Sequence, residues 1–360
     1  MATALVAILI WFAQTEGLGM QYKTIESVAY SPVSNQVVVS KLTARDARVR
    51  RKAYVTDTVR TISKINLADG LVAGIIDRNM NVVLPGSRST FHASGRNPIL
   101  CNPHKPIDYC YIYRDGDVRM NDEIIKLNHR VCSLADSKSG KFIAAAGDNV
   151  TSILDSTNNR IVAEIPNLEN SILGAPLLAF NEDETKIVSG GWLQASIRDI
   201  QSGETTPILF KGQDISVNAL VNAPNNNLIV CSDLGVSRYD YEGNFVTAID
   251  QMHASICSLS ANGKYLVTAQ ENGLTVYDLD TDQAVNAIEI NGISAVALSP
   301  SGLDVVVGFR NGKVALFETT TGNQLWMSNP PGTNRTTVLV PTALLGIWAL
   351  LFWQLSIRRA

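Results

Sequence analysis

The chain has 360 residues, enough for one large domain or two ordinary ones, and 30 Lys and Arg against 33 Asp and Glu give a net charge of −3. This balance provides no overall basic field, which argues against a dedicated nucleic-acid-binding protein. The 5 cysteines are single and widely spaced, unlike a disulfide framework, so they mildly favour a reducing, cytosolic environment.

The N-terminal segment, residues 1–24, contains an apolar run at positions 4–13. Its length suits the core of a signal peptide or an anchor, yet no Lys or Arg precedes it and no clear small-residue cleavage site follows. The alternative is a first β-strand of the folded body. Both interpretations stay open.

Residues 25–328 contain a repeated unit of short apolar strands separated by Gly or Asn turns. Clear copies lie at residues 131–147, 256–278 and 293–317, and weaker copies begin near Pro176 and Val217. The repeat spacing of about 37–45 residues is that of a four-stranded propeller blade in the WD-repeat style. The Trp-Asp pair of such repeats is reduced here to Tyr277-Asp278.

These repeats predict an all-β, WD-repeat-like β-propeller. Another copy begins at residue 25, and residues 66–127 leave room for one or two more, so we expect seven blades, with eight as the alternative. Asn-Gly dipeptides such as Asn262-Gly263 and Asn311-Gly312 predict tight hairpins in which both central residues have positive φ. The N-terminal strand, if it is one, would close the ring beside the last blade.

Residues 40–52 are the least regular part of the first repeat, because a basic loop stands where a short hairpin turn is expected. The loop contains one acid, Asp46, and six basic residues: Lys41, Arg45, Arg48, Arg50, Arg51 and Lys52. A solvated hairpin arm is one interpretation. The other is a recognition element for an acidic partner, a phosphate-bearing ligand or anionic lipid.

A second group of polar residues has spacings that zinc could use. The group comprises Cys101, His104, Cys110, His129 and Cys132. Because Cys132 and Cys257 occupy matching positions of two repeats, small buried side chains are the simpler interpretation, and we predict no metal site.

The sequence shows no arrangement of catalytic residues, such as a Ser/His/Asp set or a pair of carboxylates in a cleft. Its acids fall mostly at the turns between strands, where turn chemistry explains them. Examples are Asp155, Asp240, Asp278 and Asp280.

The C-terminal residues 338–355 carry no charge and are flanked by arginines. This length spans a bilayer as a helix, and Trp348 and Trp353 suit the headgroup region. A buried helix of a soluble domain is the alternative, but such a helix normally has a polar stripe. We therefore expect a propeller (25–328), a spacer (329–335), a transmembrane helix (336–356) and a short tail (357–360).

A propeller followed by one transmembrane helix resembles the endoplasmic-reticulum exchange factors that load GTP onto the small GTPase of COPII vesicle coats. The first blades are also similar, with a strand at 37–39, an extended loop and a strand at 65–74. The resemblance implies a cytosolic propeller on the endoplasmic-reticulum membrane that acts in vesicle transport. It also implies that the GTPase is engaged by Lys41, Thr43, Arg45, Asp46 and Arg48. In that family the loop is glycine-rich and binds a potassium ion, whereas residues 40–52 lack glycine, and the residues themselves indicate no cofactor.

A non-catalytic propeller scaffold in a membrane-protein complex is the competing interpretation. Residues 1–24 would then be a signal peptide, the propeller would be lumenal, and Arg358 and Arg359 would form a cytosolic stub, as the positive-inside rule favours. The run 321–326 resembles one repeat of quinoprotein-type propellers, a signature that lumenal propellers share. The glycosylation sequons at Asn149 and Asn334 matter only in this orientation.

Overall fold

The computed structural model describes residues 21–30, 36–49, 52–81, 99–100, 110–112, 117–120, 123–129, 131, 133–147, 149–166, 177–190, 195–208, 216–270 and 272–330. Within these ranges the chain consists of β-strands and their connections, without a helix. The predicted all-β class is confirmed. None of the residues described forms an apolar helix of membrane-spanning length. Of the N-terminal segment predicted at 1–24, residues 21–24 belong to β1 and the rest lie outside the described ranges, as does the predicted helix at 336–356.

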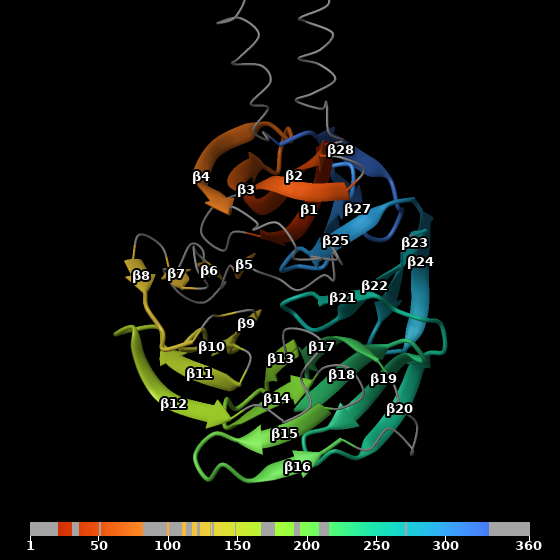
Figure 1. Cartoon of the computed structure of the whole chain (residues 1–360). Coiled ribbons are helices and arrows are strands. Elements are labelled where there is room, and N and C mark those ends of the chain that lie inside the picture. Colours follow the sequence, from red (N-terminus) through yellow and green to blue (C-terminus); the bar gives the residue numbers. More distant parts are fainter. Residues whose placement is uncertain are drawn as a thin grey trace, which may run out of the picture.

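The described strands form seven antiparallel sheets, each built from four consecutive strands (Figure 1). Sheet 1 contains β1 (Gln21–Tyr30), β2 (Gln36–Val49), β3 (Lys52–Asn66) and β4 (Val72–Asn81). Sheet 2 contains β5 (Ile99–Leu100), β6 (Cys110–Ile112), β7 (Val118–Met120) and β8 (Glu123–Ile125). Sheet 3 contains β9 (Ser133–Asp136), β10 (Phe142–Ala146), β11 (Val150–Asp155) and β12 (Arg160–Pro166).

The remaining four sheets follow the same pattern. Sheet 4 contains β13 (Leu177–Phe180), β14 (Lys186–Gly190), β15 (Ala195–Asp199) and β16 (Thr205–Pro207). Sheet 5 contains β17 (Val217–Ala223), β18 (Asn227–Ser232), β19 (Gly235–Asp240) and β20 (Phe245–Asp250). Sheet 6 contains β21 (Ile256–Leu259), β22 (Tyr265–Gln270), β23 (Gly273–Asp278) and β24 (Gln283–Glu289). Sheet 7 contains β25 (Ile293–Leu298), β26 (Asp304–Phe309), β27 (Val314–Glu318) and β28 (Gln324–Ser328).

The sheets are arranged around a common centre, with sheet 1 beside sheet 7 (Figure 1). The first strand of each sheet contacts the first strands of its neighbours in cyclic order, and β1 contacts β25. This arrangement is compatible with the predicted propeller. Because β25–β28 complete sheet 7, the described N-terminal residues add no strand to it; the closing strand expected within residues 1–20 lies outside the described ranges.

The burial of the strands follows their position in each sheet. All six residues of β25 are buried, and β26 is buried from its second residue onward, as expected for strands covered on both faces. The outer strand β24 alternates between exposed and half-buried residues. The core therefore lies between sheets, where Val296, Val307 and Phe317 of sheet 7 pack with Val267 and Val276 of sheet 6.

Neighbouring sheets also contact each other where an outer strand meets a turn glycine of the next sheet. Trp326 of β28 donates from Nε1 to the Leu67 carbonyl oxygen (2.7 Å), and its ring lies 2.9 Å from where a Cβ of Gly70 would be. Gly70 also has φ +68°. The turn therefore needs glycine because a side chain would meet the indole ring and because a positive φ strains other residues. Similar contacts pair Ile288 with Gly322 and Pro207 with Gly243.

The Asn-Gly turns differ from the predicted type. In Asn262-Gly263 and Asn311-Gly312 only the glycine has positive φ, +72° and +79°. Each asparagine Oδ1 instead accepts a hydrogen bond from the backbone N–H two residues later, at 3.1 and 3.0 Å. The side chain thus closes the turn itself, which removes the need for a left-handed asparagine.

Candidate functional site

The basic segment of the first repeat is a β-hairpin, as in the hairpin-arm interpretation, and it is paired where an irregular loop was also considered. β2 continues to Val49 and β3 begins at Lys52, with lengths of 14 and 15 residues. Among the described strands of sheets 2–7, none exceeds 7 residues. We call residues 42–49 and 52–60 the arm.

The register places the predicted contact residues along the arm. Thr43 lies opposite Val59 and Arg45 opposite Asp57, while a bulge between Arg45 and Asp46 shifts the pairing. β1 pairs with β2 as far as Arg45, and β4 pairs with β3 as far as Thr58. In the described ranges, the two strands therefore continue beyond their neighbours as a two-stranded hairpin, on which Asp46 and Arg48 lie.

Lys41, at the base of the arm, is buried with only 2 % of its surface exposed. Its Nζ donates to the Asn329 Oδ1 (2.9 Å) and to the Pro330 carbonyl oxygen (2.7 Å). Lys41 pairs in register with Thr61, whose side chain is also buried. A buried ammonium needs such acceptors, so Lys41 holds the C-terminal segment against sheet 1. This contact within the chain differs from the partner contact predicted for Lys41.

The potassium ion implied by the resemblance does not fit this segment. Such an ion is coordinated by oxygen atoms that include backbone carbonyls turned toward it. β2 is hydrogen-bonded to β1 on one side and to β3 on the other from Val37 to Arg45, so its carbonyls are engaged in the sheet. Beyond Arg45, β2 is paired with β3 alone as far as Val49, so the part of the segment paired on both sides ends at Arg45.

A disulfide joins Cys231 of β18 to Cys257 of β21, with 6.6 Å between the Cα atoms. It links sheet 5 to sheet 6 and closes a sequence separation of 26 residues. The interpretation of Cys257 as a simple buried hydrophobe was wrong. The sequence signal for the pair was weak, because the two cysteines come from different strands of successive repeats and meet only when the sheets pack.

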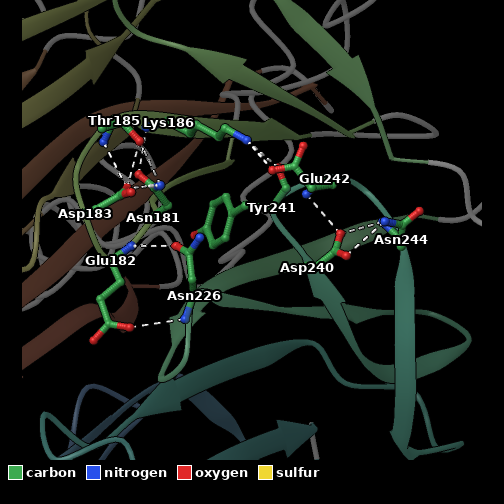
Figure 2. A network of polar contacts seen from close by, with 10 residues as sticks. All are labelled: Asn181, Glu182, Asp183, Thr185, Lys186, Asn226, Asp240, Tyr241, Glu242 and Asn244. Carbon is green, nitrogen blue, oxygen red and sulfur yellow. Dashed lines mark hydrogen bonds and ion pairs between the residues drawn. The ribbon is translucent and has the colours of Figure 1, made fainter.

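On one face of the ring, polar side chains of successive turns bind one another (Figure 2). The Glu182 N–H donates to the Asn226 Oδ1 (3.3 Å), and the Asn226 N–H donates back to a Glu182 carboxylate oxygen (3.1 Å). Lys186 Nζ donates to the Tyr241 carbonyl oxygen (3.1 Å) and to Glu242 (2.6 Å). These contacts join sheet 4 to sheet 5.

Four groups in this network (Figure 2) have shifted pKa values, and those of Asp183 and Asp240 are lowered. A hydrogen bond from Lys138, followed by one from the Asn226 backbone, lowers the pKa of the Glu182 carboxyl. Burial raises the pKa of Tyr241, whose hydroxyl donates to the Phe180 carbonyl oxygen (2.8 Å). Glu182 is therefore charged and Tyr241 neutral at pH 7, and both states suit bonds that hold turns together.

The turn acids have the role predicted for them. Asp155 accepts from the backbone N–H of Thr157 (2.7 Å), and Asp240 accepts from the N–H of Glu242 (2.9 Å). Asp278 accepts from the N–H of Asp280 (2.9 Å). These carboxylates close turns by the Asx geometry, as the sequence indicated.

The structure describes part of the cysteine and histidine group considered for zinc. His129 Nε2 lies 3.2 Å from the Ala145 carbonyl oxygen, and Cys110 lies in β6. Cys101, His104 and Cys132 lie outside the described residues. Among those that are described, no three His, Cys, Asp or Glu residues are grouped closely enough to hold a metal ion.

No family model and no curated protein matches the chain. The arm, the Lys41 contact and the disulfide are therefore interpreted from the chain's own chemistry.

Proposed function

We propose that the protein is a seven-bladed β-propeller with one C-terminal transmembrane helix, and that it is a scaffold that binds other proteins on the lumenal or extracellular side of the membrane. The cyclic contacts between the first strands of the sheets support the propeller. The uncharged run at 338–355 supports the helix. Propellers present turns from several blades on one face, which suits the binding of another protein.

The observation that carries the lumenal side is the Cys231–Cys257 disulfide. Disulfides form and persist in oxidising compartments and are rare in the cytosol. The apolar run at 4–13 acts as a signal peptide in this proposal, and the arginines at 358 and 359 stay in the cytosol.

Membrane topology tests this proposal. The full chain, with a C-terminal epitope, is placed in sealed microsomes and treated with protease, and its cysteines are alkylated before and after reduction. We expect a protected propeller, a disulfide-linked peptide pair containing Cys231 and Cys257, and a glycan at Asn149, an exposed residue before β11. A digested propeller with two free thiols and no glycan would refute the lumenal scaffold.

An exchange factor for the COPII GTPase is the second candidate, and the length of the arm favours it. The resemblance places the GTPase contact at an extended element of the first blade, which is where the arm lies. Exchange needs no covalent chemistry, because a partner that binds the nucleotide-free GTPase more tightly than the loaded form displaces the nucleotide. Thr43, Arg45, Asp46 and Arg48 are the candidates for that contact.

The rate of GDP release from the GTPase tests the second candidate. Full-length protein in lipid nanodiscs should accelerate release, and the Arg45→Ala/Arg48→Ala double variant should lose this effect. The Lys138→Ala variant is the control, since Lys138 lies in an exposed turn of sheet 3. Unchanged release at saturating protein excludes exchange activity and leaves the scaffold unaffected.

A further inference from the structure

The C-terminal segment and the arm leave the propeller at the same face. Trp326 of β28 donates to the carbonyl oxygen of Leu67, in the turn between β3 and β4. A few residues later, the Pro330 carbonyl oxygen accepts from Lys41, which pairs with Thr61. The chain from Trp326 to Pro330 therefore follows sheet 1 from the β3–β4 turn toward the tip of the arm.

The arm is long enough to reach the membrane that this segment enters. From Lys41 to Val49 an extended strand advances about 27 Å, at about 3.3 Å per residue. From Pro330, the predicted helix start at residue 336 is at most about 20 Å away along an extended chain. The arm is therefore longer than the chain that joins Pro330 to the predicted helix start, and it is long enough for its end to reach the membrane surface.

The composition of the arm suits a membrane surface. Arg48 and Lys52 lie near its tip and Arg45 lies midway along β2 of the arm, among two acids, Asp46 and Asp57, whereas the chain as a whole has a net charge of −3. Tyr54, paired in register with Ala47, is an aromatic residue of the kind enriched at the headgroup level. Basic residues next to an anionic bilayer are attracted to its phosphate groups within a Debye length of about 8–10 Å.

We propose that the arm is a membrane contact, in which Arg45, Arg48 and Lys52 bind the phosphate groups of anionic lipids in the bilayer that anchors the same chain. The proposal rests on the membrane anchor of the proposed function, and it requires anionic lipids in the leaflet that the arm faces, which the cytoplasmic leaflet carries. Lys41 is not part of this contact, because it is buried against Asn329 and Pro330. The contact would fix the orientation of the ring relative to the membrane.

Hydrogen–deuterium exchange of the full-length protein in lipid nanodiscs tests the proposal. Nanodiscs of phosphatidylcholine alone are compared with nanodiscs that also contain phosphatidylserine. We expect the amides of residues 42–58 to exchange more slowly in the anionic discs, and high salt to remove the difference. Three basic residues at an anionic surface correspond to an effect on the order of 100-fold on the docking equilibrium of the arm.

Two variants with the same change in charge separate the arm from a general attraction. In Arg45→Gln/Arg48→Gln/Lys52→Gln the anionic-lipid protection should disappear. The control changes Lys138, Arg160 and Lys264 to Gln; these exposed residues lie at the turns of the opposite face, and the protection should remain.

The possible results distinguish this proposal from the one on which it rests. A protein that fails to co-elute with the nanodiscs refutes the membrane anchor. A protein that incorporates but shows equal exchange of the arm in both lipids refutes the lipid contact alone. Protection that survives in the arm variant also refutes it, and points to a protein partner for the arm.

Discussion

Removal of the Cys231–Cys257 disulfide should lower the stability of the propeller by a predictable amount. Cross-linking two residues removes loop entropy from the unfolded chain, and a separation of 26 residues corresponds to about 3.5 kcal/mol at 25 °C in the chain-entropy relation. For a domain of about 300 residues this corresponds to a fall in Tm of about 5–6 °C. Cys231 is fully buried, so its truncation adds a small packing loss.

The assay is thermal unfolding of the full chain in detergent, followed by near-ultraviolet circular dichroism with and without reductant. Cys231→Ala, Cys257→Ala and the double variant should all unfold at nearly the same, lower temperature. Reductant should lower the Tm of the unaltered protein to that level and leave the variants unchanged. Cys110→Ala is the control, and it should retain the full response to reductant.

Two results would refute the reasoning. One is an unaltered protein whose Tm is insensitive to reductant although thiol titration shows complete reduction. The other is a double variant whose Tm still falls on addition of reductant, since the sensitive bond would then lie elsewhere.

Four further substitutions test the contacts between sheets and the buried charges by the same unfolding assay. Lys41→Met leaves two oxygens of the C-terminal segment without their donor and should lower the free energy of unfolding by about 1–3 kcal/mol. A stability equal to that of the unaltered protein would contradict the assigned contact. Trp326→Ala should lower the free energy of unfolding by about 2–3 kcal/mol, which is below the range for fully buried aromatic residues because the indole is half-buried. Gly70→Ala should lower it less in the Trp326→Ala protein than in the unaltered protein, because the indole that a Cβ at Gly70 would meet is then gone. Burial, followed by the Glu318 carboxylate, raises the pKa of Asp304 in the folded protein. The protonated Asp304 side chain therefore contributes its full stabilisation below the unfolded pKa of about 3.9. This stabilisation is lost as the pH rises through the folded pKa. Asp304→Asn should therefore raise the Tm at pH 7 and leave it unchanged at pH 3, and equal shifts at both pH values would exclude this cause.

The strands of the clear repeats could be predicted because their signals are local. Alternating or continuous apolar runs bounded by turn residues mark β21–β23 and β25–β27, and the structure places strands there. The turn acids follow from the same local chemistry, since Asp155 and Asp240 bond to backbone groups two residues away. Neither case requires knowledge of distant parts of the chain.

The extension of β2 and β3 could not be predicted in this way. Charge density in the arm left a solvated hairpin and a recognition loop as alternatives and did not show that a ladder with β3 carries β2 through Arg48 to Val49. Strand propensity depends on the neighbouring strands more than helix propensity depends on its surroundings, so pairing overrides the composition of a single segment. Tyr54 and Val55, near the tip, are good strand formers, and they were the available sequence signal that β3 extends into the arm.

The disulfide and the Lys41 contact depend on residues that are distant in sequence. Cys231 and Cys257 belong to adjacent sheets, and Lys41 binds residues 329–330 near the other end of the propeller. A spacing rule identifies neither pair, because both arise when the ring brings repeats together. The first pair bears on the compartment, and the second fixes the end of the described chain to sheet 1.

The Lys41 contact also changes how the predicted spacer works. An ammonium is expensive to bury, and Lys41 is tolerated inside sheet 1 because Asn329 and Pro330 supply oxygen acceptors. Trp326 fixes the same stretch to the turn at Leu67. The last described residues, from Trp326 to Pro330, are therefore held against sheet 1 at two points. If the proposed helix at 336–356 anchors the chain, a short connection from this fixed point restricts how far the ring can tilt, which is the geometry that the proposed contact between the arm and the membrane requires.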